Sequence, residues 1–424
     1  MIYQSINRQR LVLLLLLIAA RSAVATNGYF LEGYGTAQKG EAGVGIAVPQ
    51  DALTVATNPA GLTDVADALS FGVEVFRPDR GASLVQGGQS TSFDGDGTSQ
   101  FYLPEIGFSR HLSDRLAWGV GVYGNGGLDT DYGSNPFARF APPGSTVAQG
   151  SAGVNLQQLF VSPALSFKVD QNNAFGLALN LAYQRFEAKG IGLFAGFSET
   201  PGSVSNQGFD SSVGAGIRLG WLSHLGDAVS VGATWQSKTT TGRFSKYSGL
   251  FADAGSFDIP ETYGLGIAVR PTKALTLGLD WQRILYANVA SVGDSIDALF
   301  AGVELGARGG PGFGWRDISV VKLGGSYDLT PTLTLRAGWS KSQQPVPASQ
   351  TFFNMLAPGV ITSHVTLGGG WRFSDRNQLN IAYIHAFKNT VDGSGSIPPA
   401  FGGGEANIYL EEDSVAISLT HGFR

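Results

Sequence analysis

The chain has 424 residues, no cysteine and 60 glycines, and only 14% of its residues are charged. The lack of cysteine excludes a small disulfide-stapled module, so a secreted chain of this length needs a large self-supporting fold. The formal net charge of −5 gives no attraction for nucleic acid, and we expect no nucleic-acid partner.

Residues 1–25 have the features of a secretory signal peptide. Arg8 and Arg10 precede the apolar run LVLLLLLIAA, and the small residues AVA close the segment at Ala25. The apolar run is too short to cross a bilayer comfortably. We therefore expect this segment to be removed from the mature protein.

Residues 26–66 are the sizeable segment that precedes the first strand pattern. They are rich in alanine and glycine and contain Asn58, Pro59 and Ala60, and Pro59 cannot continue a regular helix. Two interpretations are open at this point, a compact segment of short helices or a flexible tail.

Residues 67–424 show the alternation that is typical of β-strands. In AFGLALNLAYQ (174–184), Phe175 and the next four odd-numbered residues are large and apolar, whereas the even-numbered ones are small or polar. The same pattern recurs in residues 161–169, 263–269, 275–281 and 415–423. Such strands fit either a soluble sandwich or a membrane barrel.

Connection lengths favour the barrel. Short turns are expected at residues 170–173, 225–228, 270–274, 329–332 and 374–377, and longer loops at 126–150, 194–208, 290–313, 343–358 and 391–406. Short connections on one side and long ones on the other are typical of outer-membrane barrels. We therefore predict an all-β fold, a membrane-spanning antiparallel β-barrel of about fourteen strands that uses all of residues 67–424.

Tryptophans support a membrane location. Several fall toward strand ends, where a ring with a polar handle suits the boundary between lipid and water: Trp118, Trp221, Trp235, Trp281, Trp339 and Trp371. A barrel of this width cannot fill its lumen with its own side chains. Residues 26–66 are therefore predicted to fold inside it as a hatch that plugs the lumen.

The hatch region resembles a known family. The stretch GYFLEGYGTAQKGEAGVGIAVPQDALTVATNPAGL (28–62), with its Asn58-Pro59-Ala60 element, is similar to the hatch of the FadL/TodX family of outer-membrane channels for long-chain fatty acids and hydrocarbons. NGGLDTDY (125–132) and GWRDISVVKLG (314–324) are similar to two further family segments. The resemblance implies a monomeric barrel in the bacterial outer membrane, in contact with lipid and lipopolysaccharide, for passive uptake of hydrophobic small molecules.

The resemblance also implies site residues. Arg316 matches a basic lumenal position of the family and Lys322 shares its strand parity, so both are expected to face inward and to bind a substrate carboxylate. An ion pair with lumenal acids such as Glu105 or Asp280 is the alternative. The family has a second basic residue that binds the substrate, and this sequence has no clear match for it; Lys189 is the candidate substitute. The lack of a clear match favours uncharged hydrocarbons or aromatics as substrates over fatty acids.

The resemblance further implies a kink in the third strand, through which substrate leaves sideways into the membrane. Asn125, Gly126 and Gly127 lie where that strand should bend or end. Glycine at such a place permits a bend that unpairs neighbouring backbone groups. These groups cannot stay unsatisfied in lipid, so we expect the opening to be lined by protein or its backbone groups to pair with polar atoms of the hatch.

Other motifs fail on context. GVGVYG (119–124) fits a dinucleotide-binding pattern, but no helix follows, so we expect a small-residue stripe beneath the hatch and no cofactor. The five histidines lack metal-ligand spacing, and no serine has a recognisable base and acid nearby in sequence. We expect neither a metal nor catalysis; a general diffusion porin and a barrel-embedded hydrolase are the alternative functions.

Overall fold

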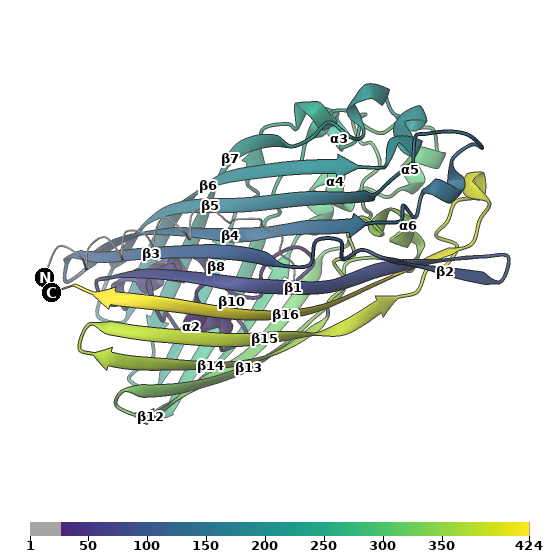
Figure 1. The fold of residues 1–424 in the computed structure, drawn as a ribbon. Coiled ribbons are helices and arrows are strands. Elements are labelled where there is room, and N and C mark those ends of the chain that lie inside the picture. Colours follow the sequence, from purple (N-terminus) through teal and green to yellow (C-terminus); the bar gives the residue numbers. More distant parts are fainter. Residues whose placement is uncertain (1–26, 424) are drawn as a thin grey trace, which may run out of the picture.

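The computed structural model describes residues 27–423. Within this range, sixteen strands form one antiparallel sheet, and fourteen of them close into a barrel (Figure 1). The predicted signal peptide and residue 26 lie outside the described residues. No helix within residues 27–423 is long and apolar enough to cross a membrane. The predicted fold class is confirmed.

The wall is an up-and-down meander closed between its first and last strands. Ala68 lies opposite Gly422 and Val85 opposite Glu405 along this closing seam. The wall strands are β1 (Ala68–Gln86), β3 (Phe101–Ser113), β4 (Leu116–Tyr132), β5 (Ala152–Lys168), β6 (Asn173–Lys189), β7 (Asp210–His224), β8 (Val229–Gln236), β10 (Thr262–Thr272), β11 (Leu275–Ile284), β12 (Ile318–Thr330), β13 (Leu333–Ser342), β14 (Ser363–Ser374), β15 (Asn377–Val391) and β16 (Glu405–Gly422). β2 (Gln89–Asp94) extends the β1 hairpin, and β9 (Thr240–Thr241) pairs with β7.

The two ends of the barrel differ as predicted. The short turns lie at the end that holds Asp67 and Phe423, and the long connections lie at the other end (Figure 1). Two details differ from expectation. β4 continues to Tyr132, so the first long connection begins at residue 133 rather than 126. Two further long connections, residues 87–100, which hold β2, and residues 237–261, were not predicted.

The long connections contain short helices: η3 (Ala138–Phe140), η4 (Gly192–Phe197), η5 (Pro201–Ser203), η6 (Ser245–Tyr247), α3 (Ala252–Gly255), η7 (Tyr286–Asn288), α4 (Ala290–Gly293), α5 (Asp297–Phe300), η8 (Ala348–Gln350), α6 (Thr351–Asn354) and η9 (Pro399–Phe401). Most make only a single turn, so packing against neighbouring loops rather than helix propensity must stabilise them.

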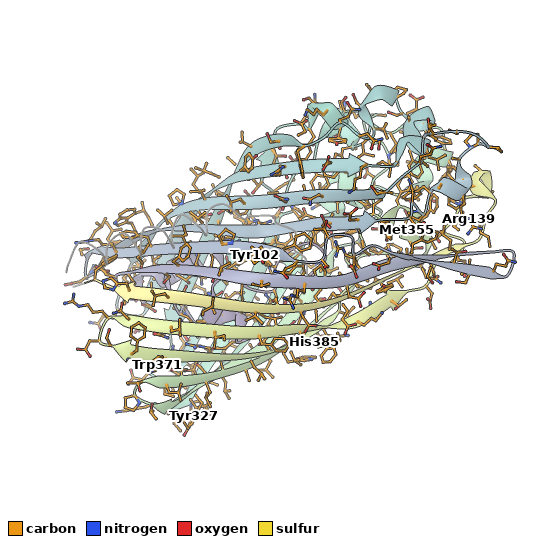
Figure 2. All side chains as sticks on the ribbon, viewed as in Figure 1. Tyr102, Arg139, Tyr327, Met355, Trp371 and His385 are labelled. Atoms are coloured by element: carbon orange, nitrogen blue, oxygen red, sulfur yellow. The ribbon has the colours of Figure 1, made fainter. Side chains whose placement is uncertain are left out.

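The outer face of the wall is apolar. Large apolar side chains such as Leu165, Leu265 and Leu367 have 52–63% of their surface exposed. A monomeric soluble protein rarely exposes so many large apolar side chains on one face. Trp371 and Tyr327 project from the wall near the end with the short turns (Figure 2). The other predicted girdle tryptophans also lie near strand ends, in two bands. This face suits lipid with an interface at each edge.

The N-terminal residues 27–66 lie inside the barrel. They form α2 (Thr36–Lys39), η1 (Ala52–Ala56) and η2 (Pro59–Thr63), which contact strands from both sides of the wall (Figure 1). Nearly all of these residues are buried. We call residues 27–66 the hatch.

Inward-facing glycines make room for the hatch. A Cβ atom added at Gly176, Gly220 or Gly324 would lie 2.0–2.3 Å from hatch atoms, far inside van der Waals contact. We call these glycines and their equivalents on other strands the glycine collar: Gly107, Gly119, Gly121, Gly176, Gly220, Gly232, Gly264, Gly266, Gly278, Gly324, Gly338 and Gly368. Glycine inside a strand often marks the close approach of another backbone, and here that backbone is the hatch.

Candidate functional site

Asn58 ties the hatch together and joins it to the wall. Its side-chain oxygen accepts a hydrogen bond from the Ala60 backbone (3.1 Å), which caps η2, while Pro59 occupies the first helical position. Its amide nitrogen donates to the carbonyls of Ile46 (2.7 Å) and Trp221 (2.9 Å). The predicted Asn58-Pro59-Ala60 element is therefore a buried turn, and the Asn58 side chain hydrogen-bonds it to β7.

Charged groups also join the hatch to the wall. Lys39 of α2 lies 2.8 Å from both Glu74 of β1 and Glu105 of β3, and all three side chains are buried. Asp280 accepts hydrogen bonds from the backbone of Gly45 (2.8 Å) and Ile46 (3.0 Å). These contacts place Glu74, Glu105 and Asp280 in the hatch interface.

The two predicted basic residues of β12 differ in position. Lys322 is buried and donates to the Glu32 carbonyl of the hatch, while its neighbours Val321 and Leu323 face outward as predicted. Arg316 is exposed, because β12 begins only at Ile318 and strand parity does not extend to residue 316. Arg316 therefore does not share the buried, hatch-contacting position of Lys322, and neither basic side chain lines the cavities described below.

The wall has a gap between β3 and β4. Their pairing ends at Ile106 and Val122, after which β3 continues along β1 and β4 continues along β5. The β4–β5 register shifts between Gly124 and Gly126, which marks a bulge at Asn125. We call this gap in the wall the window.

The hatch covers the window with its own backbone. Leu31 donates to the Asn125 carbonyl (3.3 Å), and Gly127 donates to the Tyr29 carbonyl (3.0 Å). Phe30 forms an antiparallel bridge with Gly126, where an added Cβ would lie 1.9 Å from the Tyr29 oxygen. The hatch thus pairs backbone groups of β4 that lie beyond the end of the β3–β4 ladder.

Arg80 frames the outer edge of the window. Its guanidinium donates to Asp96 (3.0 Å) and Asp129 (2.5 Å) and to the carbonyl of Thr98 (2.8 Å). Arg80 lies on β1 and Asp129 on β4, so this charged cluster joins the two strands beyond the end of β3.

We expect Arg80→Met to lower the free energy of unfolding by about 3–5 kcal/mol, because it removes the counter-charge of the buried Asp129 carboxylate. Urea unfolding of the barrel in lipid vesicles measures this change. The exposed Arg372 supplies the matched control, since Arg372→Met removes a charge at the surface. Equal stability of the two variants would contradict the framing role of Arg80.

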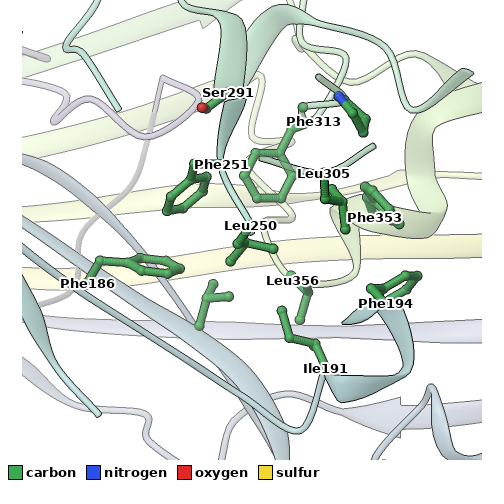
Figure 3. A pocket seen from close by; sticks show the side chains of 13 residues that line it. Phe186, Ile191, Phe194, Leu250, Phe251, Ser291, Leu305, Phe313, Phe353 and Leu356 are labelled. Atoms are coloured by element: carbon green, nitrogen blue, oxygen red, sulfur yellow. The ribbon is translucent and has the colours of Figure 1, made fainter. Parts of the chain in front are cut away.

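An apolar cavity lies among the long connections (Figure 3). Its volume is about 40 Å³. The lining residues come from β5, β6 and four connections: Val154, Phe186, Ile191, Phe194, Leu250, Phe251, Ser291, Leu305, Pro311, Gly312, Phe313, Phe353 and Leu356. None of these residues is charged, and Ser291 contributes the one hydroxyl among them.

The cavity suits a neutral apolar guest that displaces side chains. An engineered cavity of about 150 Å³ holds benzene, so a guest of that size requires the lining here to move. Asp294 lies on the same connection as Ser291, and its pKa is raised by burial and by the nearby charge of Asp253.

Ring contacts join the cavity to the window. Phe186 and Phe251 line the cavity with ring centroids 4.7 Å apart, and Phe251 lies 5.0 Å from Phe257. Phe257 in turn lies 6.2 Å from Tyr29, whose carbonyl pairs with Gly127 at the window. An unbroken line of aromatic side chains therefore runs from the cavity to the gap in the wall.

Polar side chains dominate the part of the lumen between this aromatic line and the end with the short turns. Asn125 donates to Gln158 (3.1 Å), which donates to Gln184 (3.1 Å), across β4, β5 and β6. Nearer the short turns, Ser162 donates to Asn180 (2.8 Å). We call these buried, hydrogen-bonded side chains the polar layer. An apolar guest that moved into it would break hydrogen bonds and gain none.

A second, polar cavity of about 360 Å³ adjoins the window. Thr98 and Phe101 line one side of it and Asp129 the other, and Val154 lines both cavities. Lys189 also lines this second cavity and pairs with Asp131 (2.8 Å). The predicted substrate-binding Lys189 therefore lies beside the window rather than in the apolar cavity.

The apolar cavity was missed at the level of sequence. A signal does exist: LFAGF (193–197), GLF (249–251) and FF (352–353) place phenylalanines inside long connections, where polar residues would be expected of solvated loops.

One apparent relay, among Ser340, His364 and Glu32, does not have hydrolase geometry. Serine and acid both approach Nδ1 of His364, whereas a relay needs opposite ring nitrogens.

Comparisons with known proteins agree with the geometry. A family profile described as outer membrane protein transport protein (OMPP1/FadL/TodX) matches residues 14–396. No curated protein sequence matches the chain significantly.

Several solved structures share the fold. The toluene transporter TodX of Pseudomonas putida superposes with a TM-score of 0.67 at 20% identity, over 94% of this chain and 100% of that one. A FadL homologue of Pseudomonas aeruginosa gives 0.70 at 17% identity, over 94% and 100% of the two chains. The toluene transporter TbuX of Ralstonia pickettii gives 0.63 at 18%, over 93% and 99%.

Proposed function

The chain belongs to the OMPP1/FadL/TodX family of outer-membrane transport proteins, and from this premise we propose that it is a passive channel for small hydrophobic molecules. A guest binds in the apolar cavity and leaves sideways through the window into the membrane. The observation that carries this proposal is the unbroken line of aromatic side chains between the two places.

The lateral route follows from the polarity of the lumen. Movement of an apolar guest from water into the cavity gains about 0.8 kcal/mol for each buried methylene. Further movement toward the short turns would bring it against the polar layer, with its buried Gln158 and Asn180. Movement through the window leads instead to lipid, so the route needs no energy source.

Neutral hydrocarbons, aliphatic or aromatic, are the proposed substrates, in preference to fatty-acid anions. None of the cavity-lining residues carries a charge that could bind a carboxylate. Lys322 is engaged by the hatch and Lys189 by Asp131. A carboxylate in the cavity would therefore lose its hydration without gaining a partner.

We expect Leu250→Asp to reduce hydrocarbon uptake by roughly tenfold or more, because a carboxylate added to the apolar lining opposes binding, and about 1.4 kcal/mol already corresponds to tenfold. Initial uptake rates of labelled toluene by cells with equal amounts of folded barrel measure the effect. Leu225→Asp is the matched control, since Leu225 is 60% exposed in a short turn far from the cavity. Similar rates for Leu250→Asp and wild type would place binding elsewhere.

The remaining functional assignments follow the same proposal. The hatch occupies the lumen that a general diffusion porin would leave open, and its buried contacts support a plugged channel. Arg80, Asp129 and the hatch residues have structural roles here, and we propose no catalytic activity or cofactor. We propose that the barrel works as a monomer in contact with outer-membrane lipid and lipopolysaccharide.

A further inference from the structure

Seven phenylalanines pack together at one side of the apolar cavity. They come from four separate long connections: Phe137, Phe140, Phe194, Phe197, Phe352, Phe353 and Phe401. We call them the phenylalanine lid. Tyrosine and tryptophan, which would bring a polar handle, are absent from this set.

The phenylalanine lid separates the cavity from the surroundings. Phe194 and Phe353 line the cavity on the inner side (Figure 3). Phe140, Phe197 and Phe401 are only partly buried on the outer side. A guest that reaches the cavity from this end must therefore pass between these rings.

Most ring pairs in the lid meet edge to face. Phe140 and Phe352 have centroids 5.4 Å apart with their planes at 84°, and Phe194 and Phe353 have centroids 4.9 Å apart at 80°. Phe140 and Phe401 meet similarly, at 5.6 Å and 65°. In this arrangement the positive edge of one ring contacts the negative face of another, an attraction that adds to simple burial.

We propose that the phenylalanine lid is the admission gate of the channel and that its edge-to-face packing selects flat aromatic hydrocarbons over saturated chains. This inference rests on the proposed function. The cavity is too small to hold a guest while its lining is undisturbed, so the lining, which includes Phe194 and Phe353 of the lid, must move during admission. A flat aromatic guest can replace the lost edge-to-face contacts, whereas a saturated chain restores only dispersion.

The test compares toluene with n-heptane, which have the same number of carbon atoms, at equal fractions of their aqueous saturation. Initial uptake rates are divided by the amount of folded barrel, measured from heat-modifiable electrophoretic mobility. In the double variant Phe352→Leu/Phe401→Leu we expect the toluene-to-heptane ratio to fall about two- to tenfold, as edge-to-face contacts are lost.

Two controls isolate the ring chemistry. Phe401→Tyr keeps an aromatic ring at a partly exposed position, and it should lower the ratio less than Phe401→Leu does. Phe373→Leu makes the same change as the lid variants on the outer face, where Phe373 is 47% exposed, and should leave the ratio unchanged.

The outcomes separate this inference from the function on which it rests. A lower ratio in the leucine double variant but not in Phe373→Leu supports selection by the lid. An unchanged ratio, or equal increases for both solutes, would mean that the lid is a simple barrier and would overturn the selection. If cells with the wild-type barrel took up toluene and heptane no faster than cells without the barrel, the protein would not be a channel for these solutes, and the lid would not be its gate.

Discussion

Deleting residues 26–60 should leave a barrel that assembles in the outer membrane but conducts ions, with single-channel conductance raised by roughly an order of magnitude or more over wild type. The fourteen-strand wall is too wide for its own side chains to fill, and the hatch occupies its lumen. The closing seam between β1 and β16 lies outside the deletion. Planar-bilayer recordings of the purified barrel measure the change.

Point substitutions in the glycine collar test the same idea without removing any chain. Gly220→Val would bring a Cβ to 2.0 Å from the Asn58 side chain, so the hatch must move and the conductance should rise. Gly202→Val is the control, because nothing lies within 4 Å of its added Cβ. If the deletion left conductance at the wild-type level, the hatch would not be what occludes the lumen.

Tethering the hatch across the window should abolish delivery of substrate to the membrane. The chain has no cysteine, so Leu31→Cys with Gly124→Cys introduces a unique pair of thiols. A Cβ added at Gly124 would lie 3.9 Å from Cδ1 of Leu31, so a cysteine has room at Gly124 and lies beside the side chain of residue 31. After reaction with a short, reductant-cleavable bifunctional thiol reagent, uptake should fall to that of barrel-free cells.

Reduction provides the control in the same sample. Cleavage of the cross-link should restore uptake, and each single-cysteine variant treated with the reagent should transport normally. Binding of toluene to the tethered barrel should persist, because Leu31 and Gly124 lie outside the apolar cavity. Wild-type uptake by the tethered form would mean that substrate leaves by another route.

The wall could be predicted from sequence because a strand has only two faces. In β6, each residue from Phe175 to Tyr183 lies on the face that its parity assigns, since lipid and hatch impose opposite demands on alternate positions. The same rule does not extend to Arg316. Parity holds only within a strand, and the start of β12 at Ile318 is set by how the preceding connection packs, which has no period in the sequence.

The sites were predictable only where local chemistry carries them. Asn58 and Pro59 form a helix cap that can be predicted from their order, and the glycines at 126 and 127 directly follow the bulge at Asn125. Lys322 was correctly placed inside, but its partner is a carbonyl nearly three hundred residues away, at Glu32. The cavity could not be predicted as a unit, because its lining comes from connections that meet only after the barrel closes.

The glycine collar also determines where this protein can tolerate mutation. On the lipid face, one apolar side chain can replace another, because lipid has no fixed shape to match. On the lumenal face at the height of the hatch, even a methyl group at Gly176 or Gly324 has no space. The inner wall is thus complementary in shape to the hatch, and a hatch of different shape could be engineered only if the surrounding glycines were changed with it.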